Sequence, residues 1–500
     1  MGDPVSLDSS FFLEQLRQII PPETKAYLVG GAVRDRLLGL PVHDFDLVLA
    51  GDALKLAREV ADRFGAAFYP LDIERETGRV VISLPAGKHQ FIDLARMRDA
   101  DIESDLRARD FTVNAMASDI HQPSSLVDPL NGAADLRARR LRACSSTSIQ
   151  DDPVRVLRAI RLANNYELKI EPATLKDICL NVPNIQRVSI ERLRDELFRI
   201  LDGPRPAVAL RLMEQLDILP HLLPELSSLK GVSQPAPHIS DVWTHTLDVL
   251  AKLELVLKVL GVDYDPDYAA NLAMGLVSIR LGRYRQQLYE HLNGSPNPYR
   301  SLRSLLFFAA LYHDVAKPLT SSKDNLDIIH FYRHEEIGAQ LVQRRAGALR
   351  LSNEEAERLA VILRNHMRPL WLGQTSQLPS QRAIYRFFRD TGQAGVDICL
   401  LSLADMLGIY GSSLPQDIWS HHLDVVRVLL EAWWEHPNEN ISPPPLIRGK
   451  ILIEEFGLPP GPMIGEILEA VREAQAAGEV QDLDQALNLV RSIIDSKNSG

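Results

Sequence analysis

The sequence predicts an α+β fold, in which a small head of strands and helices is followed by a long helical region. Up to about residue 145 the chain alternates short apolar runs with helical patterns, and from residue 146 onward the pattern is helical. A chain of 500 residues also exceeds what a single core usually serves. We therefore expect four parts: a head at 1–145, a helical neck at 146–225, a helical domain at 231–410 and a helical tail at 411–500.

The head begins with a turn suited to phosphate. Tyr27–Val29 predicts a strand and the residues after Gly31 predict a helix, so Gly30 and Gly31 fall at a strand-to-helix turn. Glycine at such a turn lets backbone amides approach phosphate oxygens, and the helix N-terminus adds a favourable dipole. Arg34 is placed to pair with a phosphate, and Asp35 to fix that arginine.

Two acidic residues stand on the next predicted strand. The run Phe45–Leu49 is too short for a helix and lies between a proline and a glycine. Because side chains alternate along a strand, Asp44 and Asp46 point to one face, roughly 6.6 Å apart at about 3.3 Å rise per residue. Two carboxylates so close on an apolar strand repel each other unless a cation lies between them. A Mg²⁺ ion that brings substrate phosphates meets that need.

These segments open a longer series of motifs. Gly-Gly-x-Val-Arg-Asp and Asp-x-Asp are followed in order by Asp105–Ala117, Asp128–Arg142, Asp151–Ala163 and Ser189–Leu201. Over about the first 200 residues the series resembles the class II tRNA nucleotidyltransferases and the bacterial poly(A) polymerases, template-independent enzymes of the polymerase-beta superfamily. The resemblance implies a mixed-sheet head of the polymerase-beta kind and transfer of nucleotides to an RNA 3′ end.

The resemblance implies a third carboxylate on a neighbouring strand, for which Asp93 is the matching residue. Asp44, Asp46 and Asp93 are then the catalytic residues and hold Mg²⁺ ions. Such metals lower the barrier for attack by an RNA 3′-hydroxyl and neutralise the departing pyrophosphate. The alternative for Asp93 is an ordinary aspartate at a strand end.

The resemblance also implies a nucleotide site. It assigns contacts with the nucleotide's sugar and phosphates to Arg109, Asp110 and Asn114. Asp152 and Arg155 match the protein template, which hydrogen-bonds the Watson–Crick edge of the incoming base, and Arg158 belongs to the same nucleotide-binding set. A carboxylate accepts from the exocyclic amine that C and A share, while guanidinium donors meet a ring nitrogen or a carbonyl.

The start of this template segment has a second interpretation. In the family the first template residue is commonly Glu, and here it is Asp151. The run Asp151-Asp152-Pro153 also fits a helix N-cap with Pro at the first helical position. Both interpretations can hold, because a cap also fixes where the template helix begins.

One departure from the family bears on the product. Only ten residues, ARMRDADIES, separate Leu94 from Asp105, whereas members that add the whole CCA triplet usually carry a longer flexible loop here. A shortened loop is a feature of members that stop after two C residues. The sequence therefore favours CC addition from CTP, with the terminal A, which uses ATP, left to a separate enzyme.

Histidines and aspartates downstream predict a second metal site. They occur in the order His245, His313, Asp314, His334, His366 and Asp405. The adjacent His-Asp of LYHDVAKP, with RHEEIGA after it, resembles the HD family of metal-dependent phosphohydrolases. Imidazole with carboxylate favours a transition metal such as Ni²⁺ or Mn²⁺ over Mg²⁺, and a bound metal activates water. His238 and His330 are spare candidates, and a degenerate domain that acts as a scaffold is the alternative.

The charge distribution bears on RNA binding. The net charge of −11 is unusual for a protein that contacts phosphates. One stretch, Leu136–Arg161, is nevertheless basic and contains Arg137, Arg139, Arg140, Arg142, Arg155, Arg158 and Arg161. We expect it to border the path of the RNA, with some arginines decorating a helix face. The acceptor end and 3′ terminus of tRNA would then be recognised through shape and backbone.

Composition indicates a cytoplasmic enzyme. No apolar run approaches the length needed to span a bilayer, and the N-terminus lacks a signal pattern, so we expect no membrane partner. The three cysteines, Cys144, Cys179 and Cys399, are scattered and suggest a reducing compartment. The absence of a GxxxxGK run argues against a P-loop NTPase.

Three other functions remain open. A poly(A) polymerase shares the same head, but we would expect a strongly basic C-terminal extension, and this tail is acidic to neutral. A hydrolase with an inert head is disfavoured by the intact carboxylate and template motifs. An RNA-binding module without catalysis gives no reason to crowd carboxylates where phosphates must sit.

Overall fold

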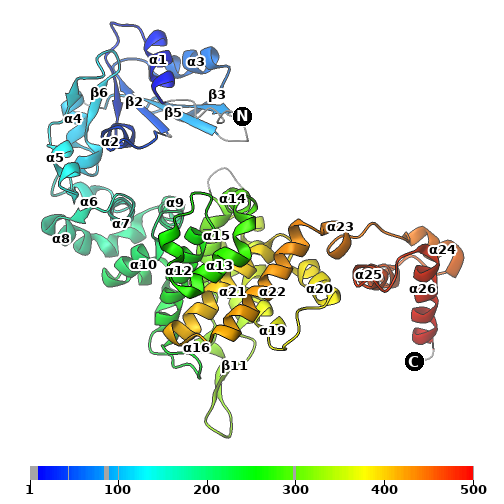
Figure 1. The fold of residues 1–500 in the computed structure, drawn as a ribbon. Coiled ribbons are helices and arrows are strands. Elements are labelled where there is room, and N and C mark those ends of the chain that lie inside the picture. The colour runs from blue at the N-terminus through cyan, green and yellow to red at the C-terminus, as the bar shows by residue number, and fades with distance from the viewer. Residues whose placement is uncertain (1–8, 43, 84–88, 99–100, 297–299, 499–500) are drawn as a thin grey trace. The chain divides into compact units, whose positions relative to one another are not determined.

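The structure is a computed structural model of the chain and describes residues 9–42, 44–83, 89–98, 101–296 and 300–498 (Figure 1). Internal contacts divide the chain into two compact units, Met1–Glu196 and Leu197–Gly500. Each unit is described by itself.

Unit 1 is built on a seven-stranded mixed sheet with the strand order β3-β4-β5-β2-β1-β6-β7. Strands β2 and β5 pair in parallel, and the other neighbouring pairs are antiparallel. The strands are β1 (Ala26–Val29), β2 (Asp44–Leu49), β3 (Ala67–Asp72), β4 (Thr77–Ser83), β5 (His89–Arg96), β6 (Ala117–Asp119) and β7 (Leu126–Val127). The mixed-sheet head expected from the sequence is confirmed.

The two faces of this sheet differ in their cover. The helices around it are α1 (Ser9–Ile19), α2 (Gly31–Leu37), α3 (Ala53–Phe64), α4 (Ile102–Arg107) and α5 (Gly132–Arg137). Phe45 is fully buried against α1, with its ring centroid 5.9 Å from that of Phe12. On the opposite face Ile102 of α4 packs in one cluster with Val48. Because side chains alternate along β2, Asp46 shares the face of Val48.

The residues after the sheet are mostly helical. They form α6 (Ser148–Asp151), α7 (Arg155–Asn165), α8 (Pro172–Asn181) and α9 (Ile190–Leu201). Two short strands, β8 (Arg140–Leu141) and β9 (Lys169–Ile170), pair in parallel and join this region to the end of the head. Helix α7 is amphipathic, and its apolar stripe, which includes Leu157 and Ile160, is fully buried.

Unit 2 is a helical body. Its helices up to residue 434 are α10 (Pro206–Gln215), α11 (Leu219–Leu222), α12 (Val242–Val259), α13 (Leu272–Leu281), α14 (Arg285–Asn293), α15 (Leu302–Tyr312), α16 (Lys317–Thr320), α17 (His334–Ala348), α18 (Asn353–Asn365), α19 (Arg368–Leu372), α20 (Gln381–Thr391), α21 (Ala394–Tyr410) and α22 (Gln416–Trp434). A hairpin of β10 (Ser321–Lys323) and β11 (Ile329–Phe331) interrupts the predicted run of helices and projects from the body in Figure 1.

Helix α21 forms the centre of this body. The expectation that no apolar run is long enough to span a bilayer is wrong for one segment of the described residues, Ala394–Ser413, which has a mean hydropathy of 1.4. However, 83% of its most apolar stretch is buried inside the protein. It packs against α12, α18 and α22. Its apolar character is therefore that of a core helix.

The tail has a small core of its own. It contains α23 (Pro437–Asn440), α24 (Gly449–Phe456), α25 (Pro462–Ala476) and α26 (Leu483–Asn498). Ile467, Val471 and Val490 are buried together in this core. Helix α23 ends at Asn440 and α24 begins at Gly449, so residues 441–448 connect them.

Candidate functional site

Three carboxylates lie on adjacent strands of the head sheet. The parallel pairing of β2 with β5 places Asp46 directly opposite Asp93, and Asp44 lies two residues before Asp46 on β2. Residues opposite each other in a sheet point to the same face, so the three carboxylates share one face. The geometry therefore brings together the residues that the sequence proposed as metal ligands.

An arginine that the sequence analysis did not select completes this cluster. Arg79 on β4 is the antiparallel partner of Asp93. Its guanidinium donates two parallel hydrogen bonds to the Asp93 carboxylate, at 2.8 and 2.7 Å. Bidentate arginine–carboxylate pairs have a specific geometry, and their charge-assisted hydrogen bonds are stronger than neutral ones. Asp93 is thus neutralised by the chain itself.

Asp46 is a carboxyl of this cluster whose pKa is shifted. Burial, together with the neighbouring charges of Asp93 and Asp44, raises its pKa to about 6, against the lowering effects of Arg109 and Arg79. A carboxyl whose ionised form is disfavoured by other carboxylates is stabilised by a divalent cation. This observation fits a metal site on these residues.

Gly30 lies close to the side chains of both Asp46 and Arg109. Its φ is +68°, a left-handed conformation that glycine adopts without strain. A Cβ at this position would lie 3.1 Å from Nη1 of Arg109 and 3.7 Å from Oδ2 of Asp46. The glycine at the strand-to-helix turn is therefore required for close approach as well as for backbone conformation.

Arg34 is held in a network behind the turn. It pairs with Asp35 at 2.9 Å, as the sequence analysis expected, and Nη1 donates to Oδ1 of Asn114 at 2.5 Å. It also donates to the hydroxyl of Tyr166, and its guanidinium lies 4.0 Å from the centroid of that ring. Arg34 is buried and committed to these partners, so a phosphate that reached it would have to share them.

Asp110 anchors the next layer of the site. It is buried and accepts hydrogen bonds from Asn114 at 3.2 Å and from Arg158 at 3.2 Å. Burial opposes its ionisation, yet Arg158 and these hydrogen bonds hold the pKa of Asp110 below its ordinary value. Arg158 also pairs with Glu196, which the sequence analysis missed. Asp110 is therefore ionised, and in this form it holds the side chains of Asn114 and Arg158 in place.

The two template candidates have different surroundings. The Arg155 guanidinium donates to the Ser148 hydroxyl at 2.7 Å and to the carbonyl of Arg109 at 3.3 Å. The side chain of Arg109 pairs with Asp105 at 3.3 Å, and its charge lowers the pKa of Asp46, so Arg155 supports the backbone of a residue that acts on the carboxylate cluster. Asp152 is instead paired with Arg192 of α9 at 2.6 Å.

The helix N-cap interpretation of Asp152 is wrong. Helix α6 ends at Asp151, and α7 begins at Arg155 with Val154 as its N-cap and no side-chain cap. Pro153 lies in an intervening turn, in which the amide of Arg155 donates to the carbonyl of Asp152 at 3.0 Å. The side chain of Asp152 is therefore not used to cap a helix.

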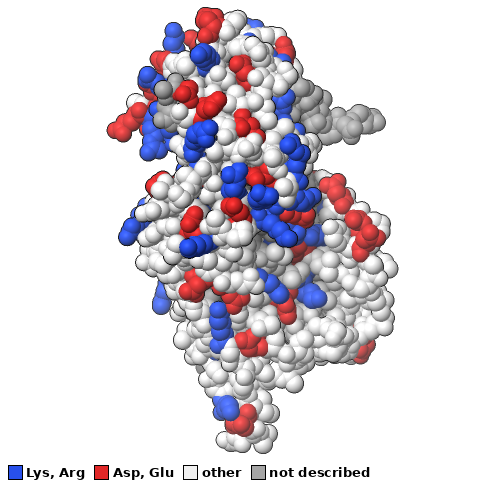
Figure 2. Space-filling view, turned by 90° about the vertical axis from the view of Figure 1, so that its left-hand side faces the viewer, with Lys and Arg blue, Asp and Glu red and all other residues white. Residues whose placement is uncertain are grey.

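The arginine-rich stretch is less basic than its sequence suggests. Arg142 pairs with Asp135, Arg139 pairs with Glu167, and Arg158 and Arg161 share Glu196. These acids lie outside the stretch, so a local count of charge did not include them. Figure 2 faces the side of unit 1 that carries α4, α5 and α8 and shows blue and red side chains beside one another.

The second constellation is assembled in the core of unit 2. The six residues proposed from the sequence are buried, each less than one-tenth exposed. The imidazole Nε2 of His245 lies 3.0 Å from Asp405, and Nε2 of His313 lies 3.2 Å from Asp314. Two overlapping groups, His245-His313-Asp314 and Asp314-His334-His366, have ligand atoms close enough to share metal ions. All six therefore form one cluster.

The histidines of this cluster are oriented as metal ligands are. The Nδ1 atoms of His313, His334 and His366 lie 2.8, 2.8 and 2.6 Å from backbone carbonyl oxygens. A proton on Nδ1 satisfies such a carbonyl and leaves Nε2 as a lone-pair donor, the usual arrangement around a metal. The inward Nε2 atoms of His334 and His366 are buried without a hydrogen-bond partner in the described part of the chain. The donor set fits a bound metal.

Electrostatics agree with this fit. Burial opposes the charge of Asp314, but His313 and Lys317 hold its pKa well below the ordinary value. Burial, with the charges of His334 and His313, lowers the pKa of His366 to about 3. The pKa of His313 is raised, because Asp314 and Asp405 outweigh its burial. Near neutral pH the cluster thus offers an ionised carboxylate and a neutral imidazole.

The spare histidines are peripheral. His238 stacks edge-on against His245 at 5.2 Å between ring centroids but belongs to neither ligand group. His330 lies on the β11 strand of the hairpin and pairs with Asp324 at 3.0 Å. Lys317, three residues after Asp314, contacts its carboxylate at 2.7 Å and was not selected from the sequence.

Comparison with known proteins identifies the family. The "Poly A polymerase head domain" matches residues 26–142, the "Probable RNA and SrmB- binding site of polymerase A" matches 167–230 and the "HD domain" matches 242–405, while a second-domain model of tRNA nucleotidyltransferases matches 442–490. The A-adding tRNA nucleotidyltransferase of Deinococcus radiodurans is 33% identical over 486 residues, which cover 95% of this chain and 97% of that protein. The chain belongs to the tRNA nucleotidyltransferase family.

Other relatives differ in the nucleotides that their names give. The CC-adding tRNA nucleotidyltransferase of Geobacter sulfurreducens is 31% identical and covers 92% of this chain and 90% of its own length. The CC-adding enzyme of Thermus thermophilus is 30% identical and covers 92% of each. This tRNA nucleotidyltransferase is therefore an enzyme of tRNA processing, and its family uses divalent metal ions.

Solved structures share its fold. The Thermotoga maritima CCA-adding enzyme complexed with tRNA has a TM-score of 0.54 at 21% identity and covers 98% of this chain and 96% of its own. A CCA-adding enzyme with ATP has a TM-score of 0.57 at 22% identity and covers 97% of this chain and 93% of its own. At these identities the likeness shows the α+β head and the helical body.

Proposed function

We propose that this tRNA nucleotidyltransferase adds C residues from CTP to the 3′ end of tRNA, without a nucleic-acid template, and leaves the terminal A to a separate enzyme. The connection after the catalytic strand carries this proposal. Strand β5 ends at Arg96 and α4 begins at Ile102, with Asp101 as its N-cap, so only residues 97–101 connect them. Residues 99–100 lie outside the described ranges. A connection of this length is too short to contain the long flexible loop of CCA-adding members.

The names of the relatives do not decide between the products, because they include both A-adding and CC-adding enzymes. The test is extension of one tRNA prepared with three 3′ ends, which lack CCA, CA or A. With CTP, we expect two C residues on the tRNA that lacks CCA and one on the tRNA that lacks CA. We expect ATP not to extend the tRNA that lacks only A. Efficient A addition to tRNA ending in CC would overturn the proposal, and long A tracts would indicate a poly(A) polymerase.

The carboxylate cluster is proposed as the catalytic centre. Asp44, Asp46 and Asp93 would hold Mg²⁺, which supplies charge neutralisation for the triphosphate. The raised pKa of Asp46 supports this assignment, because burial and two neighbouring carboxylates disfavour its negative charge. Contacts with the nucleotide's phosphates and sugar are assigned to a set around them: Gly30, Gly31, Arg34, Asp35, Arg109, Asp110 and Asn114.

Asp152 and Arg155 are proposed to present the template edge to the base of CTP. Hydrogen bonds from the Arg155 guanidinium to the Ser148 hydroxyl and the Arg109 carbonyl hold this side chain in one position, which supports the assignment. Arg158 is proposed to act indirectly, through its hydrogen bond to the carboxylate of Asp110. Replacement of Arg155 by Lys should relax discrimination between CTP and UTP, whereas Arg187→Lys, at an exposed position on the 3₁₀ turn Val182–Arg187, should not.

A second activity is proposed for the buried His/Asp cluster. Three of its histidines are oriented as ligands, and the mixed nitrogen and oxygen donors suit Ni²⁺ or Mn²⁺. A metal there would activate water toward 2′,3′-cyclic or 2′-phosphates. Ni²⁺ or Mn²⁺ binding without hydrolysis of either ester would make the domain a scaffold.

The proposed division of labour follows the expected parts: catalysis at 1–145, template and RNA binding at 146–225, the HD-type domain at 231–410 and a helical tail at 411–500. We propose the acceptor end of tRNA as the RNA partner and the cytoplasm as the site of action.

A further inference from the structure

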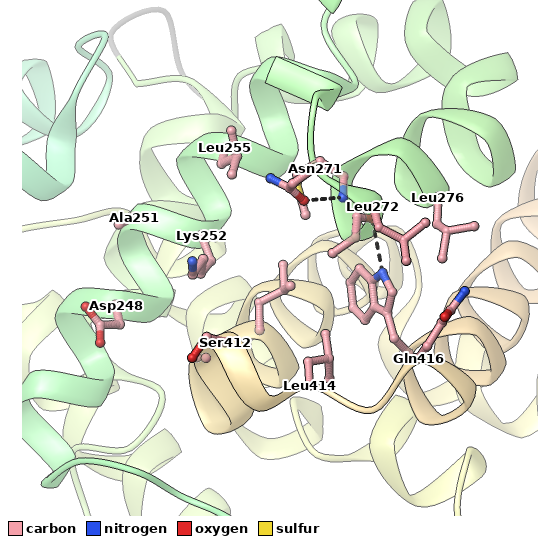
Figure 3. A pocket seen from close by; sticks show the side chains of 16 residues that line it. Asp248, Ala251, Lys252, Leu255, Asn271, Leu272, Leu276, Ser412, Leu414 and Gln416 are labelled. Carbon is pink, nitrogen blue, oxygen red and sulfur yellow. Dashed lines mark hydrogen bonds between the residues drawn. The ribbon is translucent and has the colours of Figure 1, made fainter. Parts of the chain in front are cut away.

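A cavity of about 530 Å³ lies within unit 2, beside the His/Asp cluster but outside it (Figure 3). It is lined by α12, by the start of α13, by the last turn of α21 and by the start of α22. Its volume is within the roughly 300–1,000 Å³ range of sites for small organic ligands. None of the proposed metal ligands lines it.

Most of the cavity wall is apolar. Trp419, Met274 and Leu407 are buried and present carbon surface to it. The indole of Trp419 is fixed by a hydrogen bond of 3.1 Å to the carbonyl of Ala273, drawn as a dashed line in Figure 3. Leu272 is 62% exposed at the rim. An occupant with an apolar body would cover these groups and gain from their burial.

The polar groups of the cavity favour an anion. Lys252 makes no ion pair or hydrogen bond within the described residues. The carboxylate of Asp248, one turn earlier on α12, is already paired with Arg211 at 2.9 Å. Asn271 uses its Oδ1 to cap α13 through the Met274 amide at 3.0 Å, which leaves its Nδ2 as a donor. The cavity thus offers a cation and an N–H group.

A buried nitrogen without a partner lies behind one residue of the cavity wall. His245 is 1% exposed, and its Nδ1 has no hydrogen-bond partner in the described part of the chain, unlike the Nδ1 atoms of the neighbouring cluster histidines. A Cβ at Gly408, which lines the cavity, would lie 3.3 Å from this Nδ1. Buried polar atoms are normally paired, but His245 does not line the cavity, so its Nδ1 is not a contact for an occupant.

We propose that this cavity binds an amphipathic organic anion, with an apolar body against Trp419 and Leu272 and a carboxylate, sulfonate or phosphate at Lys252. The cavity lies one to two helical turns from the His/Asp cluster, because Lys252 follows His245 by seven residues on α12 and Gly408 follows Asp405 by three residues on α21. This site is separate from the nucleotide site of unit 1 and does not depend on the proposed product.

The test is a fluorescence titration of the full-length protein with 1-anilinonaphthalene-8-sulfonate, an apolar arene with one anionic group. We expect Lys252→Gln to weaken binding about five- to tenfold, the worth of one charge-assisted contact. Ala251→Phe, which fills the cavity, should weaken it further. Lys258→Gln is the matched control, because Lys258 stands on the same helix but pairs with Glu254.

Displacement of the dye identifies the apolar body. Displacement by decanoate supports an aliphatic anion, displacement by 1-naphthoate supports an aromatic one, and 1-naphthamide should displace it less well than 1-naphthoate. Equal dye affinity of the wild-type protein and the Lys252→Gln and Ala251→Phe variants, all with intact thermal transitions, would overturn the proposal. Equal competition by the neutral and anionic naphthalenes would overturn the role of Lys252.

Discussion

The head and the HD-type body each gather acidic groups, but by opposite means. In the head, carboxylates stand on neighbouring strands, and the Asp93 side chain remains 22% exposed. In the body, carboxylates and imidazoles converge from helices and are at most 9% exposed. The strands of the head hold carboxylates at a fixed spacing on a partly exposed face, whereas the helices of the body enclose carboxylates and imidazoles in the core. The first arrangement suits a metal that arrives with its substrate, and the second suits a metal that stays.

The largest effect is expected from Asp46→Ala. Loss of the central carboxylate should lower nucleotide incorporation by about 10³-fold or more, because metal-held charge stabilisation is worth several kcal/mol. Binding of tRNA, measured by filter retention, should change little. Asp62→Asn on the exposed face of α3 is the control, and normal turnover by the Asp46 variant would refute the assignment.

The next effect separates the two centres. His313→Ala should weaken Ni²⁺ or Mn²⁺ binding by more than about 100-fold, because it removes one proposed ligand and also the imidazole that pairs with Asp314. CC addition should remain within about twofold of wild type. His330→Ala on the hairpin should change neither quantity. Parallel loss of CC addition, with an intact thermal transition, would show that the centres are not independent.

A pH profile sharpens the comparison. Because the pKa of Asp46 is about 6, this carboxyl binds a proton as pH falls through 6, and activity at subsaturating Mg²⁺ should fall there. Added Mg²⁺ competes with the proton and should move this acid limb to lower pH. Arg79→Met removes a charge that lowers the pKa of Asp46, so its limb should move to higher pH.

The control for that profile is Arg75→Gln on the exposed turn before β4, where the arginine is 69% exposed. A limb that stays in place in Arg79→Met would mean that the Arg79–Asp93 pair opens whenever metal binds. The profile is measured as the rate of CC addition at fixed low Mg²⁺ across pH 5–8.

The smallest effect concerns the exposed pair at the template. Arg192→Gln removes the partner of Asp152, and an exposed ion pair of this kind contributes about 0.5 kcal/mol or less. The midpoint of chemical unfolding should therefore barely move. Incorporation of CTP relative to UTP should change by less than about threefold. A large drop would show that Arg192 itself contacts the RNA or the base.

Local pattern was enough to predict several parts of the molecule. The two-residue period of a strand places Asp44 and Asp46 on one face, and the fold places Asp93 beside them. The order of histidines and aspartates was likewise sufficient to name all six residues that converge in unit 2. In both cases the residue types themselves carry the chemistry.

The missed residues depend on contacts between distant segments. Arg79 faces Asp93 only through the register of β4 on β5, and Tyr166 reaches Arg34 across 132 residues. Glu196 neutralises Arg158 across 38 residues. The N-cap interpretation of Asp152 failed because the turn at Pro153 precedes α7, which a capping pattern alone cannot distinguish from a helix start.

The pairing of Arg79 with Asp93 has a consequence for the resting enzyme. With the guanidinium as a placeholder, the strands that carry the carboxylates stay aligned when divalent ions are scarce. Chelation should then silence turnover without melting the head, and replenished magnesium should restore it within the time of mixing. A cell short of this ion would keep a ready reserve of the protein rather than have to rebuild it.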